Sequence, residues 1–69
     1  MKIQVKEKKL EEVLIKQGHS KRSFSKSAGI GQSTFIQVCN GDRNPSPKTA
    51  KKIVEALKLK FDDIFYVEN

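Results

Sequence analysis

The stretch of sequence that decides the fold runs from Ser20 to Pro45 and reads SKRSFSKSAGIGQSTFIQVCNGDRNP. Ser20 is a residue type that favours a helix N-cap, and Phe24 and Ala28 follow it four residues apart. Apolar residues at this spacing lie on one face of a helix, so the pattern predicts a short helix over about 21–27. Its serines make this helix intrinsically weak, and it must depend on packing.

A second helix is expected directly after a tight turn. Gly29 supplies the left-handed conformation that a short connection between helices needs, and an apolar residue beside it can hold the turn against the core. The next helix opens near Gln32, carries Phe35 and Val38 inward, and ends at the Asn-Gly stop signal of positions 40–41. Two short helices joined in this way are typical of a helix-turn-helix unit.

Further helices are predicted on both sides of this unit. A helix ending at Gly18 is indicated by the spacing of Leu10, Val13 and Leu14. After a loop that contains two prolines, Ser46-Pro47 is a favourable helix start, followed by the apolar stripe Ala50, Ile53, Val54 and Leu57. A last short helix is expected around Phe61, Ile64 and Phe65. The predicted fold class is therefore all-α, a compact five-helix domain over residues 1–69 with tails at 1–5 and 66–69.

Length and composition restrict the possible functions. Sixty-nine residues with 36% apolar content build one small core, not a large enclosed substrate cavity. The net charge is +6, from 14 Lys and Arg against 8 Asp and Glu. Between His19 and Lys52, seven basic residues stand against Asp42 alone, so all the excess charge lies in the middle of the chain. This distribution favours a polyanionic partner.

Several other classes of site lack the residues they need. Cys39 is the only cysteine and His19 the only histidine, so no disulfide and no zinc site are expected, and both residues are predicted to be packing residues. No paired carboxylates, activated nucleophile or phosphate-binding glycine loop is found, so we expect no enzyme, no metal, no cofactor and no small-molecule ligand. No membrane segment or signal peptide is found, which favours a cytoplasmic protein.

One face of the helix predicted after the turn carries uncharged polar side chains. A step of about 100° per residue puts Phe35 and Val38 on the buried side and leaves four candidates for contact with DNA bases: Gln32, Ser33, Ile36 and Gln37. Glutamine amides can pair with adenine, a serine hydroxyl can donate or accept, and isoleucine can contact a thymine methyl group. The same strip can be an ordinary polar surface, but the cations on either side favour base edges in a major groove.

These residues together resemble the helix-turn-helix of the Cro and phage-repressor type, called the Xre family, which has a lambda-repressor-like fold. The resemblance covers about residues 8–66 and rests on an ordered set: Ser20, Phe24, Ala28, Gly29-Ile30, Phe35, Val38, Asn40-Gly41, Arg43-Asn44-Pro45, Leu57 and Asp62-Asp63-Ile64-Phe65. It implies a repressor-like regulator of transcription, from a phage or mobile element, in which the positions of Gln32, Ser33 and Gln37 read bases.

Polar and cationic side chains on both sides of the reading face are expected to bind DNA phosphates. Some begin the first helix of the unit, and others follow its second helix. The expected phosphate contacts are Ser20, Lys21, Arg22, Thr34, Asn40, Arg43, Lys48 and Lys51. Backbone N–H groups at the starts of the helices that open at 21 and 47 can also donate to phosphates.

Three positions depart from the family pattern. Lys21 stands where a glutamine is usual, so phosphate binding should persist without the amide that can support Gln32. Leu14 and Cys39 replace a common pair of Arg and Glu, and we expect these two apolar side chains to touch. Ile36 stands where a small polar residue is usual, and an exposed isoleucine can equally be a protein contact.

The sequence thus predicts sequence-specific binding to double-stranded DNA, with two alternatives. A homodimer on a twofold site is expected because one small helix reads few base pairs. Its first candidate contact is the apolar segment 65–67, followed by Ile3 and Val5. One alternative is a protein-interaction module, such as an antirepressor or an antitoxin-like partner, that uses Ile36 and the same helix face. The other is a small enzyme.

Overall fold

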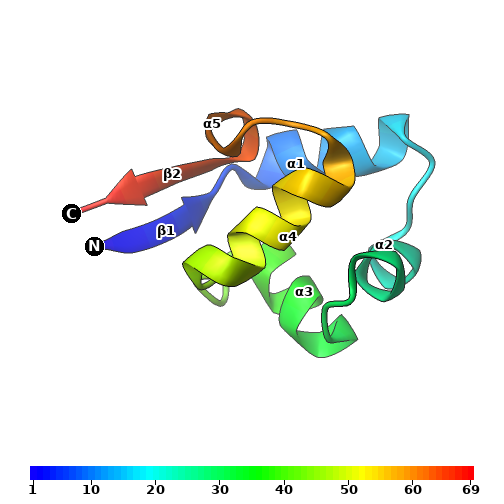
Figure 1. The fold of residues 1–69 in the computed structure, drawn as a ribbon, viewed down its shortest axis with the longest axis horizontal. Coiled ribbons are helices and arrows are strands. Elements are labelled where there is room, and N and C mark those ends of the chain that lie inside the picture. The colour runs from blue at the N-terminus through cyan, green and yellow to red at the C-terminus, as the bar shows by residue number, and fades with distance from the viewer.

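Five helices and two short strands make up the chain, and the computed structural model describes all of residues 1–69. In chain order they are β1 (Lys2–Val5), α1 (Glu7–Lys16), α2 (Lys21–Ala28), α3 (Gln32–Cys39), α4 (Pro47–Leu57), α5 (Phe61–Ile64) and β2 (Phe65–Glu68). The helices pack together, and the two strands project side by side from the end of the helical body opposite α2 (Figure 1).

The two strands correct the expectation of an all-α fold with tails. β1 and β2 pair antiparallel, with Ile3 opposite Val67 and Val5 opposite Phe65, so the two ends of the chain form a small sheet. Apolar and polar residues alternate along both strands, and antiparallel pairing therefore puts the apolar side chains of both strands on one face. The five helices themselves are found where the sequence predicted them.

Phe65 is the residue at which two further expectations are wrong. It is the first residue of β2 and not part of the last helix, because its backbone is extended, with φ −129° and ψ 162°. Its side chain is fully buried in the core, so it cannot lie on a dimer surface as the segment 65–67 was expected to do. The exposed apolar residues of that segment are Tyr66 and Val67.

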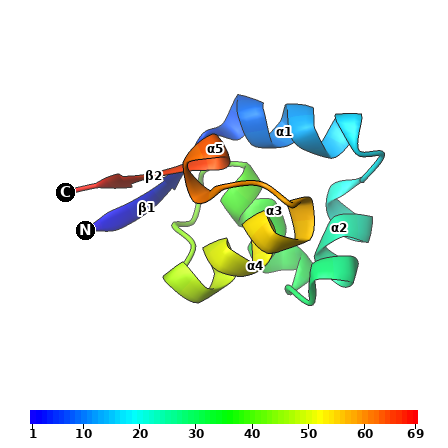
Figure 2. The same ribbon diagram turned by 45° about the horizontal axis from the view of Figure 1, so that its top comes forward.

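The helix-turn-helix unit of α2 and α3 forms as the sequence predicts (Figure 2). At its start, the Ser20 hydroxyl accepts a hydrogen bond from the Ser23 backbone N–H at 3.0 Å, and the Ser20 N–H donates to the Ser23 hydroxyl at 3.0 Å. At its turn, Gly29 adopts the left-handed conformation with φ +73°, and the half-buried Ile30 packs against the core. The turn therefore fixes the angle at which α3 leaves α2.

Replacing Gly29 with alanine tests this turn. The added methyl group meets no atom within 4 Å, so the expected loss of about 1–2 kcal/mol in the free energy of unfolding comes from the left-handed backbone alone. Gly31 is the matched control, because its φ of −57° suits any residue and it is the N-cap of α3. We expect Gly31→Ser to leave stability unchanged or raise it, and urea unfolding measures both variants. Equal effects would contradict the assigned turn geometry.

Aromatic rings from the two helices of the unit meet at the centre of the core. Phe24 and Phe35 have ring centroids 4.9 Å apart, and the half-buried His19 meets Phe24 edge-on at 5.3 Å, which confirms its predicted packing role. The core consists of Leu10, Val13, Leu14, Phe24, Phe35, Val38, Cys39, Ala50, Ile53, Val54, Leu57, Ile64 and Phe65. Because every helix contributes to it, this core holds α3 in a fixed orientation on the body.

Leu14 and Cys39 stand where the family commonly has an Arg and a Glu. Both are buried in this core. They line one open hollow of about 270 Å³, together with residues of α1, Lys21 of α2 and Asn40. No buried polar side-chain atom in the chain lacks a hydrogen-bond partner. Replacing both charged residues by apolar ones is therefore compatible with the fold, since it leaves no stranded charge.

The buried position of Cys39 predicts slow thiol chemistry. Burial raises the pKa of the Cys39 thiol from an ordinary value of 9.0 to about 11, so the neutral thiol is the form that the fold favours. The stability that the buried neutral thiol contributes is complete below pH 9 and is lost as the pH rises through about 11. At about pH 8 the native protein should react with Ellman's reagent about 100-fold more slowly than the urea-unfolded chain, from the thiolate fraction alone. Equal rates would show that Cys39 is exposed.

Candidate nucleic-acid interface

The outer face of α3 carries the side chains predicted to read DNA bases. Gln32, Ser33 and Gln37 are all exposed, whereas Phe35 and Val38 on the opposite side are fully buried. None of the three polar side chains forms a hydrogen bond with another part of the protein, so their amide and hydroxyl groups are free for a ligand. The orientation of α3 is thus the one that base reading requires.

Ile36 differs from the other three candidates. The sequence suggested an exposed isoleucine, but the side chain is half-buried. It is also not among the partly buried apolar residues that pack against the core, which are Ile3, Val5, Ala28, Ile30, Leu59 and Phe61. Its outer side can therefore contact a thymine methyl group, but it does not form the protruding apolar patch that a protein partner would use.

The N-terminus of α3 has no side-chain cap. Its N-cap is Gly31, and no side chain accepts a hydrogen bond from the first backbone N–H groups of the helix. Thr34, a predicted phosphate contact, is half-buried in this first turn. The helix thus presents free N–H donors beside Gln32, which suits an anion.

A shallow hollow of about 300 Å³ joins α2 to the start of α3. It is lined by Arg22, Ser25, Lys26, Ile30 and Gln32, so a predicted phosphate contact and a predicted base contact share one surface. Lys26 was not among the predicted site residues. It stands four residues after Arg22 in the same helix, and this spacing is the sequence signal that could have identified it.

Lys21 and Asn40 are brought together by the fold. The half-buried Lys21 donates a hydrogen bond from its Nζ to the Asn40 Oδ1 at 3.2 Å, which links the start of α2 to the end of α3. The amide oxygen of Asn40 is thereby occupied, and its NH₂ group remains free to donate. These two predicted phosphate contacts, one cation and one neutral amide, are therefore joined into one hydrogen-bonded unit.

The predicted phosphate contact Ser20 has a structural role as well. Its hydroxyl oxygen accepts the capping hydrogen bond of α2, and only its own O–H proton remains available to a phosphate. The backbone N–H groups of Lys21 and Arg22 precede the capped one in this helix and have no partner in it. The start of α2 can therefore still hold an anion.

The cations that follow α3 are exposed: Arg43 in the loop, and Lys48 and Lys51 on α4. The start of α4 is a poorer anion site than the sequence suggested. Pro47 has no N–H group, and the N–H of Thr49 donates to the Ser46 hydroxyl at 3.3 Å, which leaves the N–H of Lys48 in the first turn. Side chains rather than backbone groups must supply most of the positive charge here.

Features of other functional classes are missing from the structure. No group of three or more His, Cys, Asp or Glu side chains could hold a metal ion. No helix has the length and apolar character needed to cross a lipid bilayer.

Comparison with known protein families identifies the helix-turn-helix unit. A model of the helix-turn-helix family, HTH_3, matches residues 10–64, which include α2, the turn and α3. The chain belongs to this helix-turn-helix family. The match confirms the family expected from the sequence, and it includes every residue predicted to contact bases or phosphates.

Individual relatives of the helix-turn-helix domain agree with this assignment. Two are HTH-type transcriptional regulators of Bacillus subtilis that are themselves uncharacterized. YvzC is 27% identical over 67 residues, with 97% of this chain and 87% of the relative covered. YgzD is 30% identical over 60 residues, with 87% and 91% covered.

Solved structures share the fold. The crystal structure of the transcriptional regulator VanUg superposes with a TM-score of 0.75 at 26% identity and covers 96% of this chain and 87% of its own. A protein from Bacteroides fragilis superposes with a TM-score of 0.73 at 17% identity, with 93% and 98% covered. At this lower identity the likeness shows the fold alone.

Proposed function

We propose that this helix-turn-helix protein regulates transcription by binding specific sequences in double-stranded DNA. In this proposal α3 enters the major groove, where Gln32, Ser33 and Gln37 bond to base edges and Ile36 contacts a methyl group. Residues on α2, on the loop after α3 and on α4 hold the phosphates on either side. The relatives named as transcriptional regulators support the regulatory part of the proposal.

The single observation that carries the proposal is the orientation of α3. Its exposed face has four neighbouring residues without charge, and exposed cations lie before and after it in the chain at Arg22, Arg43 and Lys48. Neutral hydrogen-bonding groups discriminate between bases, whereas cations bind any phosphate backbone. This separation of the two kinds of contact is what sequence-specific binding requires.

Selection of bound duplexes from random DNA at physiological salt tests the proposal. We expect enrichment of a short sequence, arranged as two half-sites one helical turn apart if the protein binds as a homodimer. Affinity for the selected site should fall with salt, with a slope of about −0.9 for each phosphate neutralised. If no sequence is enriched and the affinity is insensitive to salt, the DNA-binding function is wrong and the same surface belongs to a protein-interaction module.

A further inference from the structure

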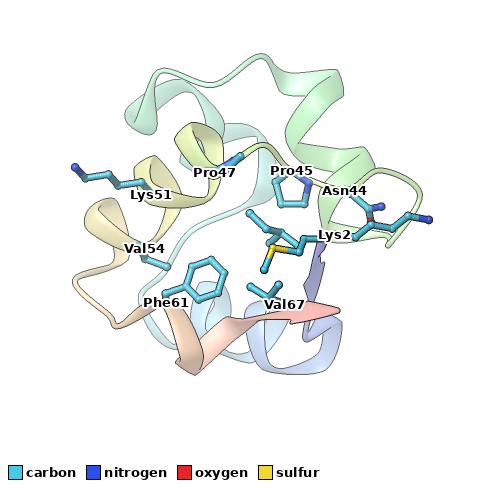
Figure 3. Close-up of a pocket in the computed structure, with 10 residues that line it drawn as sticks. Lys2, Asn44, Pro45, Pro47, Lys51, Val54, Phe61 and Val67 are labelled. Carbon is cyan, nitrogen blue, oxygen red and sulfur yellow. The ribbon is translucent and has the colours of Figure 1, made fainter. Parts of the chain in front are cut away.

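The hollow beside the start of α2 is polar, unlike the largest hollow of the molecule. The largest, an open groove of about 580 Å³, lies beside the hairpin, and no residue of α2 or α3 lines it (Figure 3). The polar hollow, of about 270 Å³, is lined by Lys21 and Asn40, both expected to bind phosphate, and by two carboxylate side chains of α1, Glu7 and Glu11. Acidic groups therefore share a surface with groups expected to bind an anion.

This arrangement is not visible in the order of charges along the chain. Residues 19–52 carry seven basic residues against one acidic residue. Both carboxylates come from α1, outside that segment, and the packing of α1 against α3 brings them to it. The hollow itself has two negative charges, Glu7 and Glu11, against one positive charge, Lys21. The most cationic part of the sequence thus meets a locally acidic surface once the chain is folded.

Glu7 lies directly against the residue that follows Asn40. That residue is Gly41, which has φ +78°, and a methyl group added there would overlap the Glu7 carboxylate. Gly41 also precedes the loop that carries Arg43, another expected phosphate contact. A phosphate bound by Asn40 would therefore lie near the Glu7 carboxylate, and two anions at close range repel each other.

Glu11 and Lys21 both act on the inner end of the hollow. Burial raises the pKa of the Cys39 thiol most, the Lys21 ammonium lowers it, and the Glu11 carboxylate raises it, so both charges reach this thiol. Leu14 also lines the hollow, and an apolar lining reduces the screening of charges by water. The hydrogen bond of Lys21 goes to the neutral Asn40 amide, and the one ion pair of the chain joins other residues. Lys21 is thus attracted by carboxylates but not fixed to one, so a phosphate can draw it away.

We propose that Glu7 and Glu11 lower the affinity of this protein for DNA by competing with a DNA phosphate for the Lys21 ammonium group. Without DNA, the carboxylates attract the ammonium towards the hollow. On DNA, they repel the phosphate that it binds. The inference rests on the proposed function, because it concerns one of its phosphate contacts. Bases take no part in this competition, so the two carboxylates weaken binding to every duplex alike.

Binding of the full chain to the selected duplex and to scrambled duplexes, measured by fluorescence anisotropy at several salt concentrations, tests this competition. We expect Glu7→Gln and Glu11→Gln each to tighten binding to all duplexes on the order of fivefold. The salt slope should steepen by up to about 0.9, the value for one more phosphate neutralised. Glu55→Gln is the matched control, since it removes the same charge from an exposed residue of α4 that lines no hollow and has no ion pair. Its smaller effect measures the change in net charge alone.

Lys21→Gln shows whether the effect passes through Lys21. Glutamine keeps an N–H donor for Asn40 but carries no charge. In this background we expect the gain from Glu11→Gln to fall to the value of the Glu55→Gln control. Gains no larger than the control in the wild-type background, or gains that persist in full without Lys21, overturn the competition.

Folding and DNA binding are checked separately in this experiment. Glu7 lies in the first turn of α1, where an acidic side chain stabilises the helix, so circular dichroism monitors each variant. Glu11→Gln retains the test if Glu7→Gln unfolds. If the wild-type protein binds no duplex, the proposed function and this inference both fail. If the wild-type protein binds a selected site and the glutamine variants match the control, only the competition is overturned.

Discussion

A chain in which both Gln32 and Gln37 are replaced by alanine is expected to lose most of its preference for its selected DNA site. Both side chains are exposed on α3 and free of hydrogen bonds to the protein, so alanine removes base contacts without disturbing packing. A good bidentate contact to a base contributes about 1–3 kcal/mol of discrimination, and the two together about 2–6 kcal/mol. Competition binding with the selected duplex and with scrambled duplexes measures this loss.

The control for this variant is a phosphate contact. Lys48→Ala should weaken binding to all duplexes by similar factors and reduce the salt slope by about 1. The glutamine variant should instead keep its affinity for scrambled DNA and its salt slope. A double glutamine variant that retains the wild-type preference would show that α3 is not the reading helix, even if the protein still binds DNA through its cations.

Replacing Phe35 with alanine is expected to have the largest effect on stability. Phe35 is fully buried, belongs to the helix proposed to read DNA bases, and its ring contacts that of Phe24. Truncation of a buried phenylalanine costs about 3–5 kcal/mol, because it removes apolar burial and leaves a cavity. A domain of this size has a total stability of about 3–10 kcal/mol, so much of the variant population should be unfolded. Thermal and urea unfolding measure the difference.

Ile15→Ala is the matched control for this core substitution. Ile15 is also a large apolar residue on a helix, but its side chain is 70% exposed, and its truncation should change stability by less than about 0.5 kcal/mol. Unfolding can also be measured with the selected duplex present. Bound DNA should raise the unfolding midpoint of the wild-type protein, because it binds the folded state. If Phe35→Ala unfolds at the wild-type urea concentration, the assigned core around α3 is wrong.

The helices could be predicted from sequence because their signals are local. Ser20 as a cap, Gly29 at the turn and the spacing of Phe24, Phe35 and Val38 each act within a few residues, and the structure confirms all of them. The exposed side of α3 follows from the same spacing, since the buried side of a helix determines which side is exposed.

The hairpin could not be predicted in this way. Four residues with alternating polarity are too short to indicate a strand, and the partner strand lies about 60 positions away in the chain. The spacing of Phe65 from Phe61 favours a helix, but Phe65 is extended because it begins β2. The open hollow that Ile3, Phe61 and Val67 help to line depends on the same distant pairing, so the sequence alone does not predict it. The Lys21–Asn40 hydrogen bond joins two helices and has no local signal at all.

The pairing of β1 with β2 has a further consequence for the order of folding. Closing a loop that contains almost the entire chain is entropically slow, whereas the turn at Gly29 joins neighbouring helices. The sheet should therefore form after the helices and open before them, so that amide hydrogens of the strands exchange with solvent sooner than those of α3. Fraying at the two ends would then release the hairpin while the part of the molecule proposed to meet the double helix keeps its shape.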